Sequence, residues 1–438
     1  MGEHDFVIRG DICYSKDRSS LETVTDGYVV CLAGKSAGVF SRLPGKYRSL
    51  PLKDYSNKLV IPGLTDLHIH APQFSFRALG MDLELLEWLE TRAFPEEARY
   101  ADPEYARRAY RLLTEHVRRG PSTRLVFFAT IHTPASLLLM DMLEESGLVC
   151  FAGKVNMDRN SPDYLRETDA DASLAATREW LTACGKYQNV RPILTPRFVP
   201  SCSDMLMKGL AEIQKEYALP LQSHLSENRK EVRWVRELCP DADGYADSYA
   251  RWDLFGGEVP TIMAHCVWTD EGEMERMAER GVFVAHCPQS NTNLASGIAP
   301  VRRFLERGVS VGLGSDVAGG VHTSIFRAMS DAIQVSKLRR VLTSEDGGVG
   351  DAHLTLEEAF FLGTAGGGAF FGKTGAPGSF APGYDFDALV LNDANLAAPF
   401  ELSIRERLER VVYMSDDRNI AAKYVRGKSL FPADGAEA

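Results

Sequence analysis

Two histidines, His68 and His70, stand two residues apart at the end of an apolar run, in the stretch IPGLTDLHIHAP. In a β-strand, residues i and i+2 project from the same face, so both imidazoles point to one place. The chain has only ten histidines among 438 residues. The pair therefore indicates a shared ligand, and neutral imidazole nitrogens are typical ligands of divalent metal ions.

Other ionisable residues follow apolar runs further along the chain in the same way. They are His224, His265, His286 and Asp316. Three or four imidazoles with one carboxylate, and a position left for water, are typical of a catalytic Zn²⁺ site, although Fe²⁺ or Mn²⁺ also fits. A metal ion can lower the pKa of bound water to about 7, so the sequence predicts metal-assisted hydrolysis.

Two residues beside this set are given other roles. Glu227 comes three residues after His224, where a strand is expected to lead into a helix, and we predict that it moves a proton between water and the leaving group. A glutamate in the first turn of a helix also stabilises the helix dipole, and both roles can hold together. His286 is interpreted as a hydrogen-bond partner of Asp316 or as a substrate contact, because four histidines already suffice for the metal.

Eight short apolar runs recur along the chain, and segments with helical periodicity separate most of them. Near-continuous apolar character is typical of strands buried on both faces of a parallel sheet. Eight such strands with crossover helices predict an α/β fold, a (β/α)₈ TIM-type barrel in which the C-terminal strand ends converge on one mouth. The runs cover residues 58–70, 124–132, 147–156, 190–198, 219–227, 260–266, 281–288 and 309–316. Residues far apart in sequence can therefore meet at that mouth.

The two ends of the chain have a different pattern, with short strands separated by turns. We predict that residues 1–61 and 376–438 join in one small β-sandwich-like domain. The barrel then occupies residues 62–375.

Composition excludes some classes of function. The net charge is −11, whereas a nucleic-acid surface needs clustered Lys and Arg side chains, so we expect a small-molecule substrate. The N-terminal stretch MGEHDFVIRG carries no signal pattern and no apolar run approaches the length of a membrane span, so we expect a cytoplasmic protein without a membrane partner. Eight scattered cysteines without a C-x-x-C pair are expected to be reduced, mostly buried thiols.

The order of these residues, with H-x-H after the first strand, His after the fifth and sixth and Asp after the eighth, resembles the amidohydrolase superfamily of metal-dependent hydrolases. Within it, stretches such as GKVNMDRNSPDYLRE, PRFVPSCS and QSHLSEN resemble the guanine deaminase family, and similar stretches run from about residue 61 to residue 340. The resemblance implies Glu227 as proton shuttle and Asp316 as a second catalytic residue. It also implies one Zn²⁺ per subunit held by His68, His70, His224, His265 and Asp316.

The resemblance further implies the substrate contacts Gln73, Arg197, Phe198 and His224. Guanine carries acceptors at O6 and N7, which an Arg fork can engage in two places, while a Gln offers a donor and an acceptor to the remaining edge. Phe198 can stack on the ring. The stretches QSNTNL and SDVAGGVH depart from the commoner family pattern, so the fine shape of the pocket is less secure than the reaction.

The implied reaction is hydrolytic deamination of guanine to xanthine and ammonia by a metal-activated water, in a homodimeric enzyme. One alternative is deamination of a related aminopurine, a pterin or a triazine, for example 8-oxoguanine. Another is a two-metal hydrolase with a carbamylated lysine at the end of the fourth strand, where this chain has TPRF and offers only Lys154 nearby. A non-catalytic scaffold has no reason to keep all five ligands together with Glu227.

Overall fold

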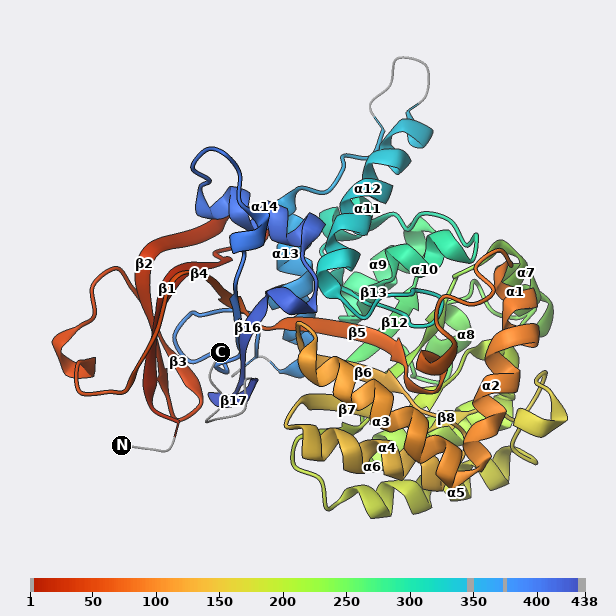
Figure 1. The fold of residues 1–438 in the computed structure, drawn as a ribbon. Helices are drawn as coiled ribbons and strands as arrows, with labels where there is room; N and C mark the ends of the chain where they lie inside the picture. The colour runs from red at the N-terminus through yellow and green to blue at the C-terminus, as the bar shows by residue number, and fades with distance from the viewer. Residues whose placement is uncertain (1–3, 345–349, 373–375, 432–438) are drawn as a thin grey trace.

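The computed structural model describes residues 4–344, 350–372 and 376–431, and its strands fall into two groups (Figure 1). A seven-stranded sheet lies at one end of the molecule, and two parallel four-stranded sheets surrounded by helices form the rest. The predicted boundary after residue 375 falls at a position outside the described residues.

The seven-stranded sheet combines strands from both ends of the chain, in the order β17-β16-β15-β4-β1-β2-β3. Its strand β4 pairs in parallel with β1 on one edge and antiparallel with β15 on the other. These pairings join all seven strands in one continuous sheet. The sheet curls onto itself, because Phe6 of β1 and Tyr424 of β16 stand three strands apart in this order yet have ring centroids 5.3 Å apart, so the predicted sandwich-like arrangement is not contradicted. The strands are β1 (Phe6–Ser15), β2 (Leu21–Leu32), β3 (Lys35–Phe40), β4 (Leu52–Pro62), β15 (Ala388–Leu391), β16 (Ile420–Val425) and β17 (Lys428–Phe431).

Eight further strands lie within the apolar runs of the sequence and form two parallel sheets, β5-β6-β7-β9 and β11-β12-β13-β14. The first sheet contains β5 (Leu64–His70), β6 (Ser122–Phe128), β7 (Val149–Gly153) and β9 (Val190–Pro192). The second contains β11 (Leu221–Leu225), β12 (Thr261–His265), β13 (Phe283–His286) and β14 (Ser310–Leu313). A short pair, β8 (Val155–Asn156) and β10 (Thr195–Pro196), extends the strand ends beyond β7 and β9.

Backbone hydrogen bonds connect the two parallel sheets at both of their edges. Between β9 and β11, the Gln222 amide donates to the Leu194 carbonyl at 2.9 Å. Between β14 and β5, the Asp316 amide donates to the His68 carbonyl at 2.8 Å, and the His70 amide donates to the Val317 carbonyl at 3.1 Å. The second junction brings the last strand beside the first, so that residues about 250 positions apart become neighbours.

Helices connect the strands, and some of their ends carry standard caps. The Asp102 side chain accepts from the Glu104 amide at the start of α3, and Gly281 ends α9 with φ of +66°. The helices are α1 (Leu85–Trp88), α2 (Phe94–Ala98), α3 (Pro103–Arg119), α4 (Thr133–Ser146), α5 (Ala170–Cys184), α6 (Asp204–Tyr217), α7 (Arg229–Leu238), α8 (Asp247–Ala250), α9 (Glu271–Arg280), α10 (Pro288–Asn293), α11 (Val301–Glu306), α12 (Ile325–Thr343), α13 (Leu356–Phe361) and α14 (Ile404–Met414).

The parallel strands are buried on both faces, as their composition predicts. One small apolar cluster takes side chains from five of these strands and the segments beside them, and its members are Leu67, Val126, Phe151, Ile193, Ile262, Ala264, Ala285 and Phe370. Alternate residues of the same strands, such as Leu125 and Met263, belong to a larger cluster shared with the helices. Opposite faces of each strand therefore contact different cores.

A buried ionic network fastens the parallel strands to the seven-stranded sheet. Arg124 of β6 donates to both carboxylate oxygens of Asp387, at 2.6 and 2.9 Å, and to Asp385 at 3.0 Å. The Arg124 side chain is 1% exposed and that of Asp387 is fully buried. Each buried charge thus has an opposite charge beside it, as a low-dielectric interior requires.

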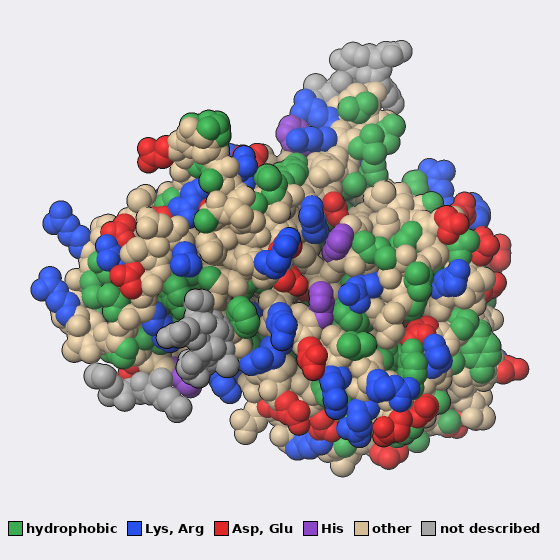
Figure 2. Space-filling model, in the orientation of Figure 1, with side chains coloured by type: hydrophobic (Ala, Val, Ile, Leu, Met, Phe, Trp, Pro, Cys, Tyr) green, Lys and Arg blue, Asp and Glu red, His purple; other side chains and the backbone are tan. Residues whose placement is uncertain are grey.

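The surface carries mixed charges. On the face shown in Figure 2, Lys and Arg side chains alternate with Asp and Glu, and no continuous basic area is visible there. Among the described helices, none combines the length and the apolar character needed to cross a bilayer. The eight cysteines are buried thiols that form no disulfide.

Candidate metal centre and substrate cavity

Four histidines and one aspartate converge at the C-terminal ends of the parallel strands. His68 and His70 lie at the end of β5, His224 in β11, His265 at the end of β12, and Asp316 just after β14. All five are at most 8% exposed. His265 and Asp316 adopt positive φ values of 70° and 46°, a costly conformation for residues other than glycine that is frequent at functional sites.

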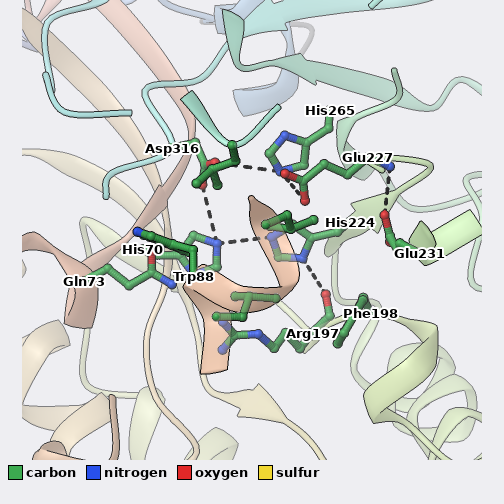
Figure 3. A pocket seen from close by; sticks show the side chains of 13 residues that line it. His70, Gln73, Trp88, Arg197, Phe198, His224, Glu227, Glu231, His265 and Asp316 are labelled. Carbon is green, nitrogen blue, oxygen red and sulfur yellow. Dashed lines mark hydrogen bonds and ion pairs between the residues drawn. The ribbon is translucent and has the colours of Figure 1, made fainter. Parts of the chain in front are cut away.

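The possible ligand atoms of these residues occupy one small volume, and Figure 3 shows those of His70, His224, His265 and Asp316. The Nε2 atoms of His70 and His224 are 3.1 Å apart, and Asp316 Oδ1 is 3.0 Å from His68 Nε2. Asp316 Oδ2 lies 3.8 Å from His265 Nε2. Two groups share His68: one also contains His224 and His265, and the other also contains His70 and Asp316. Within each group, all ligand atoms lie within 4.8 Å of one another. The structure therefore brings all five predicted ligands together.

Hydrogen bonds at the opposite ring nitrogens fix the tautomers of two of these histidines. His224 Nδ1 lies 2.6 Å from the carbonyl oxygen of Arg197, and His265 Nδ1 lies 2.8 Å from Oδ1 of Asn291. An oxygen acceptor requires a proton on Nδ1, so in the neutral ring the lone pair is on Nε2. Both Nε2 lone pairs then face the shared volume, which is the orientation that a metal ligand needs.

The charge states of two histidines and the aspartate of the cluster also suit a cation. Burial lowers the pKa of His70 and His224 well below the usual value, so both rings are neutral and able to donate lone pairs. Burial opposes ionisation of Asp316, yet the neighbouring His68 holds the pKa of this carboxyl well below its usual range. Zinc–nitrogen bonds of about 2.0–2.1 Å at angles of about 90–110° separate two nitrogens by about 2.9–3.4 Å. The 3.1 Å between His70 and His224 falls within this range.

Glu227 stands beside the cluster, outside the set of five. Its Oε2 lies 3.5 Å from His265 Nε2, and its Oε1 accepts a hydrogen bond from the Ser296 hydroxyl at 3.1 Å. Burial raises the pKa of Glu227 above that of an ordinary glutamate. A carboxyl with a raised pKa is suited to accept and return a proton near neutral pH.

The backbone of Glu227 is held by a residue that the sequence interpretation missed. Glu231 Oε2 accepts from the amides of Glu227 and Asn228, at 3.0 and 3.1 Å, and its Oε1 accepts from the Tyr245 hydroxyl at 2.6 Å. The Asn228 side chain and Glu231 form a capping box at the start of α7. The N-x-x-E spacing is visible in the sequence and signals the helix start, although it does not reveal the contact with Glu227.

A cavity adjoins the ligand cluster, and His70, His224, His265 and Asp316 form part of its lining. The predicted substrate residues Gln73, Arg197, Phe198 and His224 all line it, together with Glu227. Leu85, Trp88, Leu89 and Leu294 supply apolar walls. The structure thus places the predicted substrate contacts on one cavity with the predicted ligands His70, His224, His265 and Asp316, while His68 is absent from its lining.

The side chain of Glu97, also missed from the sequence, connects two of the cavity residues. Its carboxylate accepts two hydrogen bonds from Arg197, at 2.5 and 3.0 Å, and one from Gln73 at 2.8 Å. Glu97 lies 100 positions before Arg197, and no local pattern announces that pairing.

His286 and Lys154 lie apart from the ligand cluster. His286 lines a separate small cavity with Arg302 and Asp351, and it is absent from the lining of the site cavity. This location differs from the expected contact with Asp316 or substrate, because the His286 side chain at the end of β13 faces the helices. Burial lowers the pKa of His286 to about 3. Lys154 Nζ is 2.5 Å from Glu167 and so is engaged in a buried ion pair away from the cluster.

Comparison with known proteins agrees with this geometry. A solved guanine deaminase from C. acetobutylicum with guanine bound in its active site superposes with a TM-score of 0.93, at 43% identity, over 98% of this chain and all of that one (100%). The guanine deaminase of Dictyostelium discoideum is 37% identical over 86% of this chain and 83% of its own length, and that of Mus musculus is 37% identical over 97% and 96%.

The amidohydrolase family matches residues 59–430, which include both parallel sheets and, of the seven-stranded sheet, β15, β16 and parts of β4 and β17. The chain therefore belongs to the amidohydrolase family.

Proposed function

We propose that this protein hydrolyses guanine to xanthine and ammonia. The observation that carries the proposal is that one cavity has three imidazoles, an aspartate and Glu227 on one wall and Gln73, Arg197 and Phe198 on another, with the fourth imidazole, His68, in contact with the aspartate. The first group suits activation of water, and the second suits recognition of a flat ring with acceptors on its edge. Relatives from several kingdoms that are named guanine deaminase support the same substrate.

The metal site of this proposal consists of His68, His70, His224, His265 and Asp316, with one divalent ion per subunit. Nitrogen donors with a single carboxylate favour Zn²⁺, and Fe²⁺ or Mn²⁺ accept the same donors. When bound, such an ion supplies Lewis acidity that lowers the pKa of water. The Nδ1 hydrogen bonds of His224 and His265 keep their Nε2 lone pairs directed at the site.

Glu227 carries the proton transfers in this scheme, and Asp316 orients the water. As the water oxygen bonds to C2, the π pair of the C2–N3 double bond moves to N3, and Glu227 Oε2 takes the proton that water releases. Glu227 then returns the proton to the 2-amino group, the pair on N3 restores the double bond to C2 as the bond from C2 to the amino nitrogen breaks, and ammonia leaves. The 2-hydroxy product tautomerises to xanthine. The raised pKa of Glu227 favours both directions of transfer. Asp316, which remains ionised, accepts a hydrogen bond from the attacking water and orients it.

The ring is oriented by side chains on the other wall. Arg197 N–H groups donate to O6 and N7, the Gln73 amide contacts the remaining edge, and Phe198 packs against the ring face. His224 contacts substrate as well, because its ring lines the same cavity. Apolar neighbours such as Leu85 and Trp88 exclude bulk water and thereby strengthen these polar contacts.

The architecture we propose around this site is a closed (β/α)₈ barrel over residues 62–375, with a small β-domain from residues 1–61 and 376–438. The hydrogen bonds at both junctions of the two parallel sheets support closure. The separate apolar cluster formed by Leu67, Val126 and Ile262 supports a filled barrel interior. A cytoplasmic homodimer remains a prediction from the sequence resemblance.

The proposed function is tested with the purified, zinc-loaded protein and a panel of substrates. Ammonia release is measured with guanine, 8-oxoguanine, adenine, a 2-aminopterin and an aminotriazine, and the purine product is identified by mass. We expect guanine to give the highest kcat/KM and xanthine as product. A higher kcat/KM with the pterin, the triazine or 8-oxoguanine would replace guanine as the substrate.

A further inference from the structure

Glu97 is a buried carboxylate that contacts two residues of the cavity wall without lining the cavity itself. It belongs to α2 and is 2% exposed. Oε1 accepts from Gln73 Nε2 at 2.8 Å and from Arg197 Nη2 at 3.0 Å, and Oε2 accepts from Arg197 Nη1 at 2.5 Å. One carboxylate therefore receives donors from both polar residues that face the substrate edge.

These contacts fix which atoms Gln73 and Arg197 offer to a ligand. A carboxylate accepts hydrogen bonds only, so the Gln73 amide must turn its NH₂ group to Glu97, and its oxygen accepts from the Ala318 amide at 3.1 Å. Arg197 has five N–H donors, of which Glu97 takes two, and three remain. The α2 side chain Phe94 also packs against the Arg197 guanidinium, with 5.2 Å between its ring centroid and the guanidinium carbon. Thus α2 determines the position of Arg197 through both residues.

The same contact determines the charge of the cavity wall. Arg197 is 3% exposed, so its positive charge is poorly screened by water, and the only carboxylate paired with it among the described residues is Glu97. With that pair formed, the wall offers N–H donors without a net positive charge. Such a wall suits an uncharged ring with acceptors on its edge and gives little advantage to an anionic ring.

We propose that Glu97 is a positioning and specificity-determining residue, which orients the donors of Arg197 and Gln73 and cancels the charge of Arg197 so that the cavity selects uncharged heterocycles over anionic ones. This inference rests on the proposed function for its substrate, guanine. The selection against anions concerns binding and can be measured without turnover.

The test is Glu97→Gln, which keeps the shape of the side chain and removes its charge. We expect KM for guanine to rise about tenfold or more while kcat changes less than about threefold, because a buried charged pair is broken away from the reacting atoms. Binding of two rings is measured by calorimetry at pH 7.5: hypoxanthine, which is uncharged, and urate, which is an anion. The ratio of their dissociation constants is expected to shift about tenfold or more in favour of urate.

Matched variants separate charge from geometry. Glu96→Gln removes a neighbouring carboxylate of α2 that contacts Arg99 and Tyr105, and it is expected to leave the binding ratio unchanged. Glu97→Asp keeps the charge but shortens the side chain, so it should weaken guanine binding and retain the preference for the uncharged ring. When Arg197→Gln is already present, Glu97→Gln should change the ratio of the two dissociation constants much less than it does alone, because its effect passes through Arg197.

Three results would overturn the proposal. They are an unchanged hypoxanthine-to-urate ratio in Glu97→Gln, an equal shift in Glu96→Gln, and a shift in Glu97→Asp as large as that in Glu97→Gln. Zinc content and the thermal midpoint are measured for each variant, and Glu97→Asp decides the question if Glu97→Gln does not fold. If the unaltered protein fails to deaminate guanine, the proposed function fails, whereas the binding ratio still decides the role of Glu97.

Discussion

Asn291 provides a sharp test of how the metal site is prepared. Its Oδ1 lies 2.8 Å from His265 Nδ1, and Asn291 is 1% exposed. The hydrogen bond keeps the proton on Nδ1 and leaves the Nε2 lone pair free for a metal ion. Replacement by leucine, which has a similar volume, removes the acceptor while the apolar packing is largely kept.

The expected cost follows from the burial of this pair. A buried hydrogen bond contributes about 0.5–1.5 kcal/mol, and a donor left without a partner costs about 1–3 kcal/mol. At about 1.4 kcal/mol per tenfold change, Asn291→Leu should weaken zinc binding by about 10- to 100-fold, the range usual for residues that orient a metal ligand. Asn291→Asp keeps an oxygen acceptor at the same position and should bind zinc at least as tightly as the unaltered protein.

The assay is competition between the metal-free protein and a chromogenic chelator, with zinc added in small steps. Circular dichroism of each metal-free variant controls for folding. If Asn291→Leu bound zinc within about threefold of the unaltered protein, the tautomer of His265 would not depend on Asn291, and the reasoning from hydrogen bonds to ligand orientation would be refuted.

Three other substitutions test separate parts of the account. Glu227→Gln should keep zinc but lower kcat by about 10²- to 10⁴-fold, measured as ammonia release; near-full turnover would contradict the proton transfer. Arg124→Met leaves Asp387 buried without its cation and should lower the free energy of unfolding by about 3–5 kcal/mol in urea titrations. Arg426→Met, at the exposed edge of the same ionic network, should lower it far less. Equal losses in the two variants would contradict the stabilising role of the buried pair. Burial raises the pKa of Asp331 to about 6, so the folded state holds this proton more tightly than the unfolded state and loses stability as the pH rises from about 4 to about 6. Asp331→Asn should therefore be more stable than the unaltered protein at pH 8 but not at pH 4. The same difference in the free energy of unfolding at both pH values would contradict this.

Much of the site was predictable because strand periodicity is local. The two-residue spacing of His68 and His70 places both on one face, and apolar runs ending in His224 and His265 announce buried strands. The convergence of strand ends then supplies the long-range contacts. The break between β4 and β5 falls beside the predicted domain boundary after residue 61, although Pro62 and Gly63 lie inside one apolar run. A Cβ at Gly63 would stand 2.3 Å from Thr123 Oγ1, a requirement that only the packed neighbour reveals.

The missed residues act through side-chain pairing across the fold. Glu97 and Asn291 contact Arg197 and His265 through hydrogen bonds between separate elements, and neither residue type nor spacing identifies such partners. His286 is the opposite case, a residue that the sequence pattern places at the site and the structure does not. It ends a strand like the ligands, yet its side chain lines another cavity, because strand neighbours alternate between faces and the run alone does not fix which face is which.

The most direct test of the central claim is to restore zinc stepwise to chelator-treated protein while guanine deamination and bound zinc are measured in the same samples. The account predicts no turnover without metal and a linear gain that stops at one zinc per chain, with no zinc retained at this site by His68→Ala. Turnover by protein shown to be free of metal, or a gain that continues to two ions per chain, would contradict it.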